Sequence, residues 1–213
     1  MSDYKISYEY NGALYLNITN RCPNICVFCI KNKWDMMYRG YNLKLKKEPT
    51  LYEIIKDVEL NFNQKDYKEI VFCGYGEPTM RWDIVKEFCR IVRTGGIKNI
   101  DKHKRIRINT NGLGNLINKK DITSEMKNLI DSLHVSLNTI DPHQWISIMR
   151  PFKDYENGFD SVVDFILRAK KNVGEVVITA VELKDVNIEA VENFALKIGV
   201  KFRKRPLLDY EKT

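Results

Sequence analysis

The sequence predicts an α/β fold built as a partial (βα)6 TIM-like barrel that is open on one side. Two observations lead to this prediction. Short runs rich in valine, isoleucine and phenylalanine alternate with longer segments in which apolar residues recur every three or four positions. No internal repeat and no linker rich in proline and glycine interrupts this alternation. Strands separated by helices pair in parallel through right-handed crossovers.

The number of strands decides between a closed and an open arrangement. Six strands are expected, and a closed eight-stranded barrel typically takes about 250 residues, whereas this chain has 213. Six βα units would therefore leave the barrel open along one side. An open doubly wound sheet is the alternative, and in both folds ligands bind at the carboxyl ends of the strands.

The expected strands are short runs of β-branched, aliphatic and aromatic residues that end at polar residues or glycine. The first strand leads into a loop that contains a Cys-Pro dipeptide, and the second ends at Gly74 and Gly76. In chain order the strands are expected at 14–19, 69–73, 105–109, 133–137, 176–181 and 200–205.

The helices are expected from apolar stripes at helical spacing. Thr50 is placed to cap the first helix, whose stripe includes Ile54 and Val58, and Gly95 with Gly96 terminates the second. In chain order the helices are expected at 50–62, 81–93, near 124–130, 158–171 and 188–198. Each of them joins two consecutive strands.

Composition indicates a single domain, 1–213, with a core from about 14 to 205. Apolar residues make up 44% of the chain and charged residues 30%, which is the balance of a globular protein. No apolar run approaches the roughly 18 residues of a membrane span. The first residues lack the basic-then-apolar layout of a signal peptide. We therefore expect a cytoplasmic protein with no membrane association, and the sequence leaves its oligomeric state open.

The chain is basic. Lys and Arg exceed Asp and Glu by 35 − 28 = 7, and the basic residues gather at 102–107 and 201–205. Such an excess favours an anionic partner such as a nucleotide, phosphate or nucleic acid. A solvated basic surface is the simpler explanation, so charge alone assigns no function.

Three of the five cysteines lie within eight residues, as Cys22, Cys26 and Cys29. Three thiolates this close in sequence can bind a single metal ion or cluster, so the spacing indicates a metal site. Zinc sites usually have four ligands in two pairs, and an iron–sulfur cube normally takes four cysteines. Three cysteines would leave one iron open for chemistry, and zinc completed by a remote ligand is the alternative. Cys73 and Cys89 are expected in the core, although the strand-end position of Cys73 leaves a substrate-side role open.

The loop Cys22-x3-Cys26-x-Phe28-Cys29 resembles the signature of the radical S-adenosylmethionine (SAM) enzymes. The resemblance covers about 14–205 and implies a partial (βα)6 barrel. It also implies one 4Fe–4S cluster bound by the three cysteines, with SAM chelated at the fourth iron. Reductive cleavage of SAM would give a 5′-deoxyadenosyl radical that abstracts hydrogen from a substrate. A reductant such as flavodoxin or ferredoxin would supply the electron.

Polar and glycine residues follow the expected strands where the resemblance places the cofactor. Gly74-Tyr75-Gly76-Glu77 resembles the family's Gly-Gly-Glu stretch, with a tyrosine between the glycines. The resemblance implies that Glu77 accepts a hydrogen bond from the ammonium group of the methionine part of SAM. The fifth-strand segment, at 176–182, matches the family's adenine motif poorly. The predicted SAM-contacting residues are Phe28, Gly74, Gly76, Glu77, Asn109, Asn111, Ser136, Asn138 and Arg150.

The sequence does not identify the substrate. Several segments are also similar to small radical SAM proteins associated with TatD-type nucleases, a likeness that places the chain near nucleic-acid metabolism only by association. A peptide or protein and a nucleotide or nucleic acid are both compatible with the sequence. The open barrel favours a large or partner-presented substrate, and the charge favours an anionic one. The alternatives from other classes are a zinc-stabilised, non-catalytic nucleic-acid-binding module and an electron-transfer protein.

Overall fold

The computed structural model describes residues 4–208 and contains one seven-stranded sheet. Its strand order is β1-β2-β5-β6-β7-β8-β9, and all neighbours from β2 to β9 pair in parallel, as predicted. The strands are β1 (Ser7–Tyr10), β2 (Ala13–Leu16), β5 (Glu69–Phe72), β6 (Arg105–Thr110), β7 (Ser132–Ser136), β8 (Glu175–Val181) and β9 (Lys201–Arg205).

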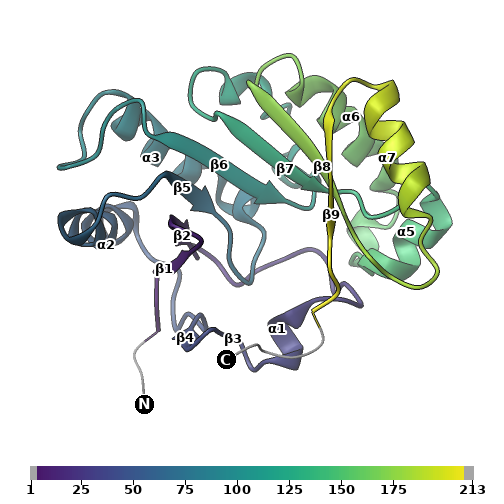
Figure 1. Ribbon diagram of the computed structural model, residues 1–213, viewed down its shortest axis with the longest axis horizontal. Coiled ribbons are helices and arrows are strands. Elements are labelled where there is room, and N and C mark those ends of the chain that lie inside the picture. Colours follow the sequence, from purple (N-terminus) through teal and green to yellow (C-terminus); the bar gives the residue numbers. More distant parts are fainter. Residues whose placement is uncertain (1–3, 209–213) are drawn as a thin grey trace.

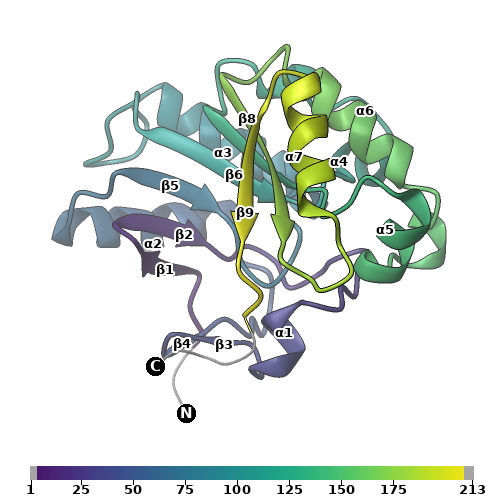
Figure 2. The ribbon, with the colours of Figure 1, turned by 45° about the vertical axis from the view of Figure 1, so that its right-hand side comes forward.

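Helices follow the parallel strands and cover the outer side of the curved sheet (Figures 1 and 2). The helices are α1 (Ile30–Lys33), α2 (Leu51–Gln64), α3 (Trp82–Arg93), α4 (Gly114–Asn118), α5 (Pro142–Met149), α6 (Phe159–Ala169) and α7 (Ile188–Lys197). The 3-10 turns are η1 (Pro78–Arg81), η2 (Ser124–Met126) and η3 (Lys153–Tyr155), and the hairpin strands are β3 (Met37–Tyr38) and β4 (Tyr41–Asn42). Thr50 caps α2 through a capping box with Glu53, as predicted.

The barrel is not closed. The edge strands of the sheet are β1 and β9, which do not pair with each other. The predicted open arrangement of six parallel strands is therefore confirmed, with β1 added as an antiparallel strand beside β2. The turn that joins β1 to β2 consists of Asn11 and Gly12, both with positive φ, which is the usual geometry of a two-residue hairpin turn.

One expected helix is wrong. The segment near 124–130 forms only the short turn η2, and Asn128 adopts a left-handed φ of 61° that no α-helix contains. Met126 and Ile130 still pack into the core, as their apolar character requires. A further helix, α5, precedes α6 between β7 and β8, where only one helix was expected.

Side chains alternate between the two faces of the sheet. On β6 the side chains of Ile106 and Ile108 are fully buried in the main core beneath the helices. Arg105 and Arg107 point to the opposite side, into a cavity of about 540 Å³. We call this helix-free side of the sheet the inner face. Most residues that line the cavity are charged or polar, so this side of the half-barrel is suited to ions and hydrogen bonds.

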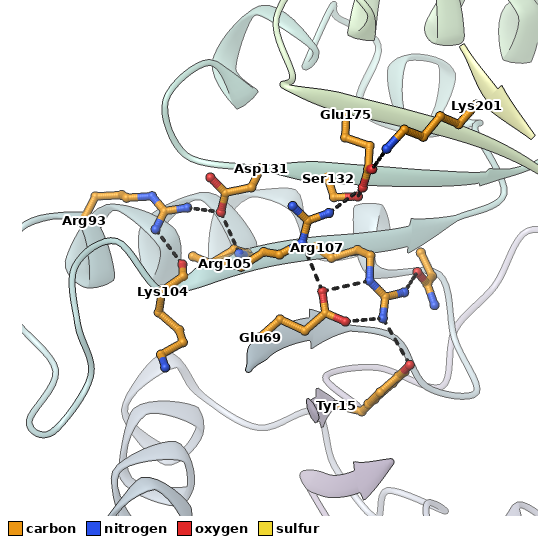
Figure 3. A network of polar contacts seen from close by, with 12 residues as sticks. Tyr15, Glu69, Arg93, Lys104, Arg105, Arg107, Asp131, Ser132, Glu175 and Lys201 are labelled. Carbon is orange, nitrogen blue, oxygen red and sulfur yellow. Dashed lines mark hydrogen bonds and ion pairs between the residues drawn. The ribbon is translucent and has the colours of Figure 1, made fainter. Parts of the chain in front are cut away.

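Ion pairs link neighbouring strands across the amino-terminal half of the inner face (Figure 3). The Arg107 guanidinium, with only 7% of its side chain exposed, donates to Glu69 at 2.9 and 3.2 Å. Glu175 accepts from Lys201 and Ser132, both at 2.6 Å, and pairs with Arg105. These contacts join β5, β6, β7, β8 and β9 without an apolar core on that side.

Replacing Glu175 should make the protein less stable at neutral pH and less sensitive to acid. Its hydrogen bonds with Lys201 and Ser132 lower the pKa of Glu175 to about 2. Because the folded-state pKa lies below the unfolded value of about 4.3, this stabilisation is present above that value and is lost as pH falls toward 2. We expect Glu175→Gln to lower the free energy of unfolding by about 1–3 kcal/mol at pH 7.

Urea unfolding at pH 7 and pH 3 measures this effect. The control is Glu192→Gln on the exposed side of α7, which should change stability by less than about 0.5 kcal/mol. An equal loss of stability for Glu175→Gln at both pH values would contradict the assignment.

Candidate active site

The three clustered cysteines lie on the loop between β2 and α1, at the carboxyl end of the sheet. Backbone hydrogen bonds fasten this loop to the end of α5. Ile25 N donates to Arg150 O at 3.0 Å, Val27 N to Ile148 O at 2.9 Å, and Phe152 N to Pro23 O at 2.8 Å. A segment more than a hundred residues away in sequence therefore fixes the path of the cysteine loop.

The three thiols are half-buried and act on one another electrostatically. Burial, with the nearby Glu77 carboxylate, raises the pKa of Cys22 to about 12. Burial and the neighbouring Cys22 and Cys29 raise the pKa of Cys26 as well. Thiolates are costly here without a positive partner, whereas metal binding releases the thiol protons and repays that cost.

The surroundings of the cysteines fit an iron–sulfur cluster. Asn24, between Cys22 and Cys26, is buried, and neither polar atom of its side chain has a hydrogen-bond partner within residues 4–208. A buried amide in that state indicates a ligand in the loop. The described residues also contain no group of three Cys, His, Asp or Glu gathered for a single metal ion.

Glu77 lies at the start of η1 and is 3% exposed. Its Oε1 accepts hydrogen bonds from Thr79 N at 3.0 Å and from the hydroxyls of Thr79 and Thr110, both at 2.7 Å. Its Oε2 accepts from Asn111 N at 2.7 Å. Burial raises the pKa of Glu77, and these hydrogen bonds oppose that rise. Oε1 thus accepts three hydrogen bonds and Oε2 one. Because each carboxylate oxygen has about two lone-pair sites, Oε2 is the oxygen that can accept a further donor.

Gly74 and Gly76 allow the Glu77 turn to lie against the segment that leads into the cysteines. A Cβ on Gly74 would lie 2.2 Å from Asn17 Oδ1, and one on Gly76 would lie 2.3 Å from the carbonyl oxygen of Thr19. At both glycines the backbone therefore lies close to another part of the chain, where a side chain would not fit. In the same place Glu77 N donates to Arg21 O at 2.8 Å, so the two loops are joined directly.

The end of β6 also reaches the cysteines. The Asn111 amide nitrogen lies 4.0 Å from Cys22 Sγ, while its Oδ1 accepts from Leu113 N. Asn109 points to the inner face and accepts a hydrogen bond from Arg107 at 2.6 Å. The structure thus brings Glu77, Asn111 and Cys22 together, as the sequence predicted.

Other predicted site residues are placed differently. Asn138 is fully buried, and its side chain bonds to Val181 N, Ser136 O and Met149 Sδ, so direct contact with a cofactor would break internal hydrogen bonds. Phe28 packs against the main core. The Arg150 side chain is exposed at the end of α5, where its left-handed backbone contributes a carbonyl to the cysteine loop.

Several residues of the site were not predicted. Met149 connects the site to α5, since its sulfur lies 3.9 Å from Cys26 Sγ. Arg205 is a second such residue, since it donates a hydrogen bond at 3.3 Å to Ser136, which was among the predicted site residues. Cys89 is buried in the core as expected, whereas Cys73 is half-buried and does not belong to the hydrophobic core. The basic run at 201–205 marked Arg205, but only the strand register shows which of its residues turn inward.

Comparison with known proteins decides the family. The model of the radical SAM superfamily matches residues 16–198. This chain belongs to the radical SAM superfamily. It is therefore a radical SAM enzyme, and its cofactors are a 4Fe–4S cluster and SAM. The match spans the cysteine loop and the four parallel strands from β5 to β8.

Individual relatives agree with this membership. The chain is 28% identical over 183 residues to GTP 3′,8-cyclase from Mannheimia succiniciproducens, covering 85% of this chain and 48% of that protein. The fold is similar to that of HydG, a maturase of the [FeFe]-hydrogenase (TM-score 0.63, 17% identity, 92% of this chain and 42% of that one). It is also similar to methylornithine synthase (TM-score 0.58, 16% identity, 94% and 55%). The chain thus spans about half the length of the curated relative it matches.

The part of the chain that the structure describes has no helix with the length and apolar character needed to cross a lipid bilayer.

Gly76→Ala should disrupt the junction of the two loops. The added Cβ would meet the backbone carbonyls of Thr19 and Arg21 at 2.3 and 2.7 Å, and backbone atoms cannot move aside as a flexible side chain can. We expect the free energy of unfolding to fall by about 3 kcal/mol, measured by urea denaturation. Gly174→Ala is the control, because its Cβ would lie 3.5 Å from the nearest atom, Asp131 O, an ordinary contact. Equal stability of the two variants would exclude this packing.

Proposed function

We propose that Cys22, Cys26 and Cys29 bind the 4Fe–4S cluster and that the carboxyl ends of β5, β6 and β7 bind SAM beside it. The observation that carries this proposal is the junction of the cysteine loop with the Glu77 turn, through the hydrogen bond from Glu77 N to Arg21 O. The 4.0 Å approach of Asn111 to Cys22 supports it from the neighbouring strand. Three cysteines leave one iron without a protein ligand, and that iron is available to SAM.

When bound, the cluster and SAM supply an electron and a 5′-deoxyadenosyl radical, which abstracts hydrogen from the substrate. The residues of the chain bind and orient. Oε2 of Glu77, which already accepts a hydrogen bond from the backbone N–H of Asn111, would also accept one from the ammonium group of SAM. That hydrogen bond would be buried and charge-assisted. Thr79 and Thr110 hold the other oxygen, so the carboxylate is already oriented before SAM binds. Asn138 positions Met149 and β8, and acts on the site only through them.

The substrate class follows from charge and shape. The inner face is polar and carries more cations than carboxylates along the cavity beside β9, so we propose an anionic substrate. A nucleotide or nucleic acid is supported by the relative whose name gives GTP as its substrate, and a peptide or protein is the second candidate. Since the chain spans only 48% of that relative, the cyclisation itself is not proposed for it.

The open barrel supports a large or partner-presented substrate, because β1 and β9 leave the inner face accessible between them. We further propose that a flavodoxin or ferredoxin supplies the electron and that the protein acts in the cytoplasm. The zinc-stabilised binding module has no support in the site, where no single-ion ligand group forms among the described residues.

Alanine at any one of the three clustered cysteines should abolish the cluster. Each thiolate would bind a different iron, so its loss opens that iron to solvent. After anaerobic reconstitution, wild-type protein should contain about four irons and four sulfides per chain, and Cys22→Ala, Cys26→Ala and Cys29→Ala far fewer. Cys89→Ala is the control, since Cys89 is buried in α3 away from the loop. Stoichiometric zinc without sulfide in wild-type protein would refute the cluster assignment.

Glu77→Gln should separate SAM binding from cluster binding. The glutamine side chain lacks the negative charge that attracts the ammonium, and its NH2 group would face the donors that now bond to Glu77. The free energy of SAM binding should weaken by roughly 1.5–3 kcal/mol. We therefore expect SAM affinity to fall about ten- to a hundredfold, while iron content stays near wild type. Equilibrium binding of SAM, iron analysis and 5′-deoxyadenosine formed with dithionite measure the three effects. Glu192→Gln serves again as control, and unchanged SAM affinity in Glu77→Gln would remove Glu77 from the site.

A further inference from the structure

The inward side chains of β9 form a row of three cations along the open edge of the half-barrel. Lys201, Arg203 and Arg205 alternate on this strand and lie in register with Val177, Thr179 and Val181 of β8. Lys201 is paired with Glu175 at 2.6 Å (Figure 3). The row runs toward the carboxyl ends of the strands, since Arg205 donates to Ser136 at the end of β7.

The other two members of the row have no counter-ion. Within residues 4–208 no carboxylate lies within 4.0 Å of the guanidinium of Arg203 or Arg205, whereas Arg105, Arg107 and Lys201 are all paired. The Nε atom of Arg205 is buried and has no hydrogen-bond partner in that range. Its one side-chain hydrogen bond is the weak contact to Ser136 Oγ at 3.3 Å. A buried cationic donor without an acceptor is costly, and such groups call for a ligand.

The cavity beside this row is cationic. It has a volume of about 540 Å³, within the usual range of small-molecule sites. Five cations and two carboxylates line it, an excess of 5 − 2 = 3: Lys68, Arg105, Arg107, Lys201 and Arg203 against Glu69 and Glu175. His134 on its wall stays neutral near pH 7, because burial and the adjacent Arg107 and Arg203 lower the pKa of His134 to about 4. The wall thus offers a neutral imidazole near the unpaired guanidinium of Arg203.

We propose that Arg203 and Arg205 bind a phosphoryl group of the substrate, inside the half-barrel and separate from the SAM site. This inference rests on the proposed function and names the substrate class for it: a phosphorylated compound of about nucleotide size. A guanidinium fork matches two oxygens of a phosphoryl group, and two forks two residues apart on one strand can share its oxygens.

The position of the row gives the substrate an orientation. In the amino-terminal half of the inner face, Glu69 and Glu175 already neutralise Arg105, Arg107 and Lys201, so the phosphoryl group is held at Arg203 and Arg205 instead. The remainder of the substrate then extends beyond Arg205 toward Cys26 and the SAM-binding strand ends. The unpaired guanidinium groups thereby anchor the end of the substrate that does not react.

Calorimetric titration of inorganic pyrophosphate into reconstituted, SAM-saturated holoenzyme tests the proposal, with succinate as the carboxylate arm. We expect wild-type protein to bind pyrophosphate, Arg203→Gln and Arg205→Gln to bind it about tenfold more weakly or worse, and succinate to bind less well than pyrophosphate. Lys204→Gln is the matched control. It removes the same charge from the same strand, but Lys204 pairs with Glu182 at 2.9 Å, away from the row, so pyrophosphate affinity should stay near wild type.

Three results would overturn the proposal. One is equal weakening by Lys204→Gln, which would show a nonspecific charge effect. Another is a loss of SAM affinity in Arg205→Gln with pyrophosphate binding unchanged, which would assign Arg205 to the SAM carboxylate. The third is succinate binding as tightly as pyrophosphate, or no binding of either anion. Iron content and 5′-deoxyadenosine formation on the same samples report separately on the proposed function, so its failure is distinguishable from failure of the anion site.

Discussion

The contact between the Glu77 turn and the segment before the cysteines is the constraint on which the rest of the site depends. Gly76 lies against the carbonyls of Thr19 and Arg21, where no side chain fits, and Glu77 N donates to Arg21 O. Because the turn follows β5 and the cysteine loop follows β2, the pairing of these two neighbouring strands sets how the loops meet. The Glu77 carboxylate then extends the connection to Thr110 and Asn111 at the end of β6. One junction thus places the ends of three strands around the cysteines.

The fold divides its two stabilising interactions between the faces of one sheet. The main apolar core lies beneath the helices, where side chains such as Phe72 and Ile108 are fully excluded from water. The inner face is stabilised by ion pairs such as that of Arg107 with Glu69, each with further polar neighbours. An interior of this kind costs desolvation energy, but it lets charged molecules enter without displacing a hydrophobic core.

Sequence patterns predicted the features that depend on local chemistry. The alternation of strands and helices and the Thr50 cap both follow from residues close together in the sequence. The Asn11-Gly12 turn was equally legible, and it would have predicted β1. Sequence patterns gave wrong predictions where contacts with distant residues determine the local structure. Asn138 follows its strand as a site residue would, yet Val181 and Met149 take up its hydrogen bonds. Asn128 ends η2 by its backbone conformation, which the apolar spacing around it does not reveal.

The charge on β9 has a consequence for association between copies of the chain. A strand at the edge of a sheet presents unpaired backbone groups, and a second chain can add to it unless charge or shape prevents this. Four of the five residues of β9 are Lys or Arg, so two such edges brought together would repel each other. The positive charge of β9, which we propose binds an anion on the inner face, therefore also disfavours pairing of this edge strand with the same strand of another copy. A strand with negative charge would pair with this edge more readily.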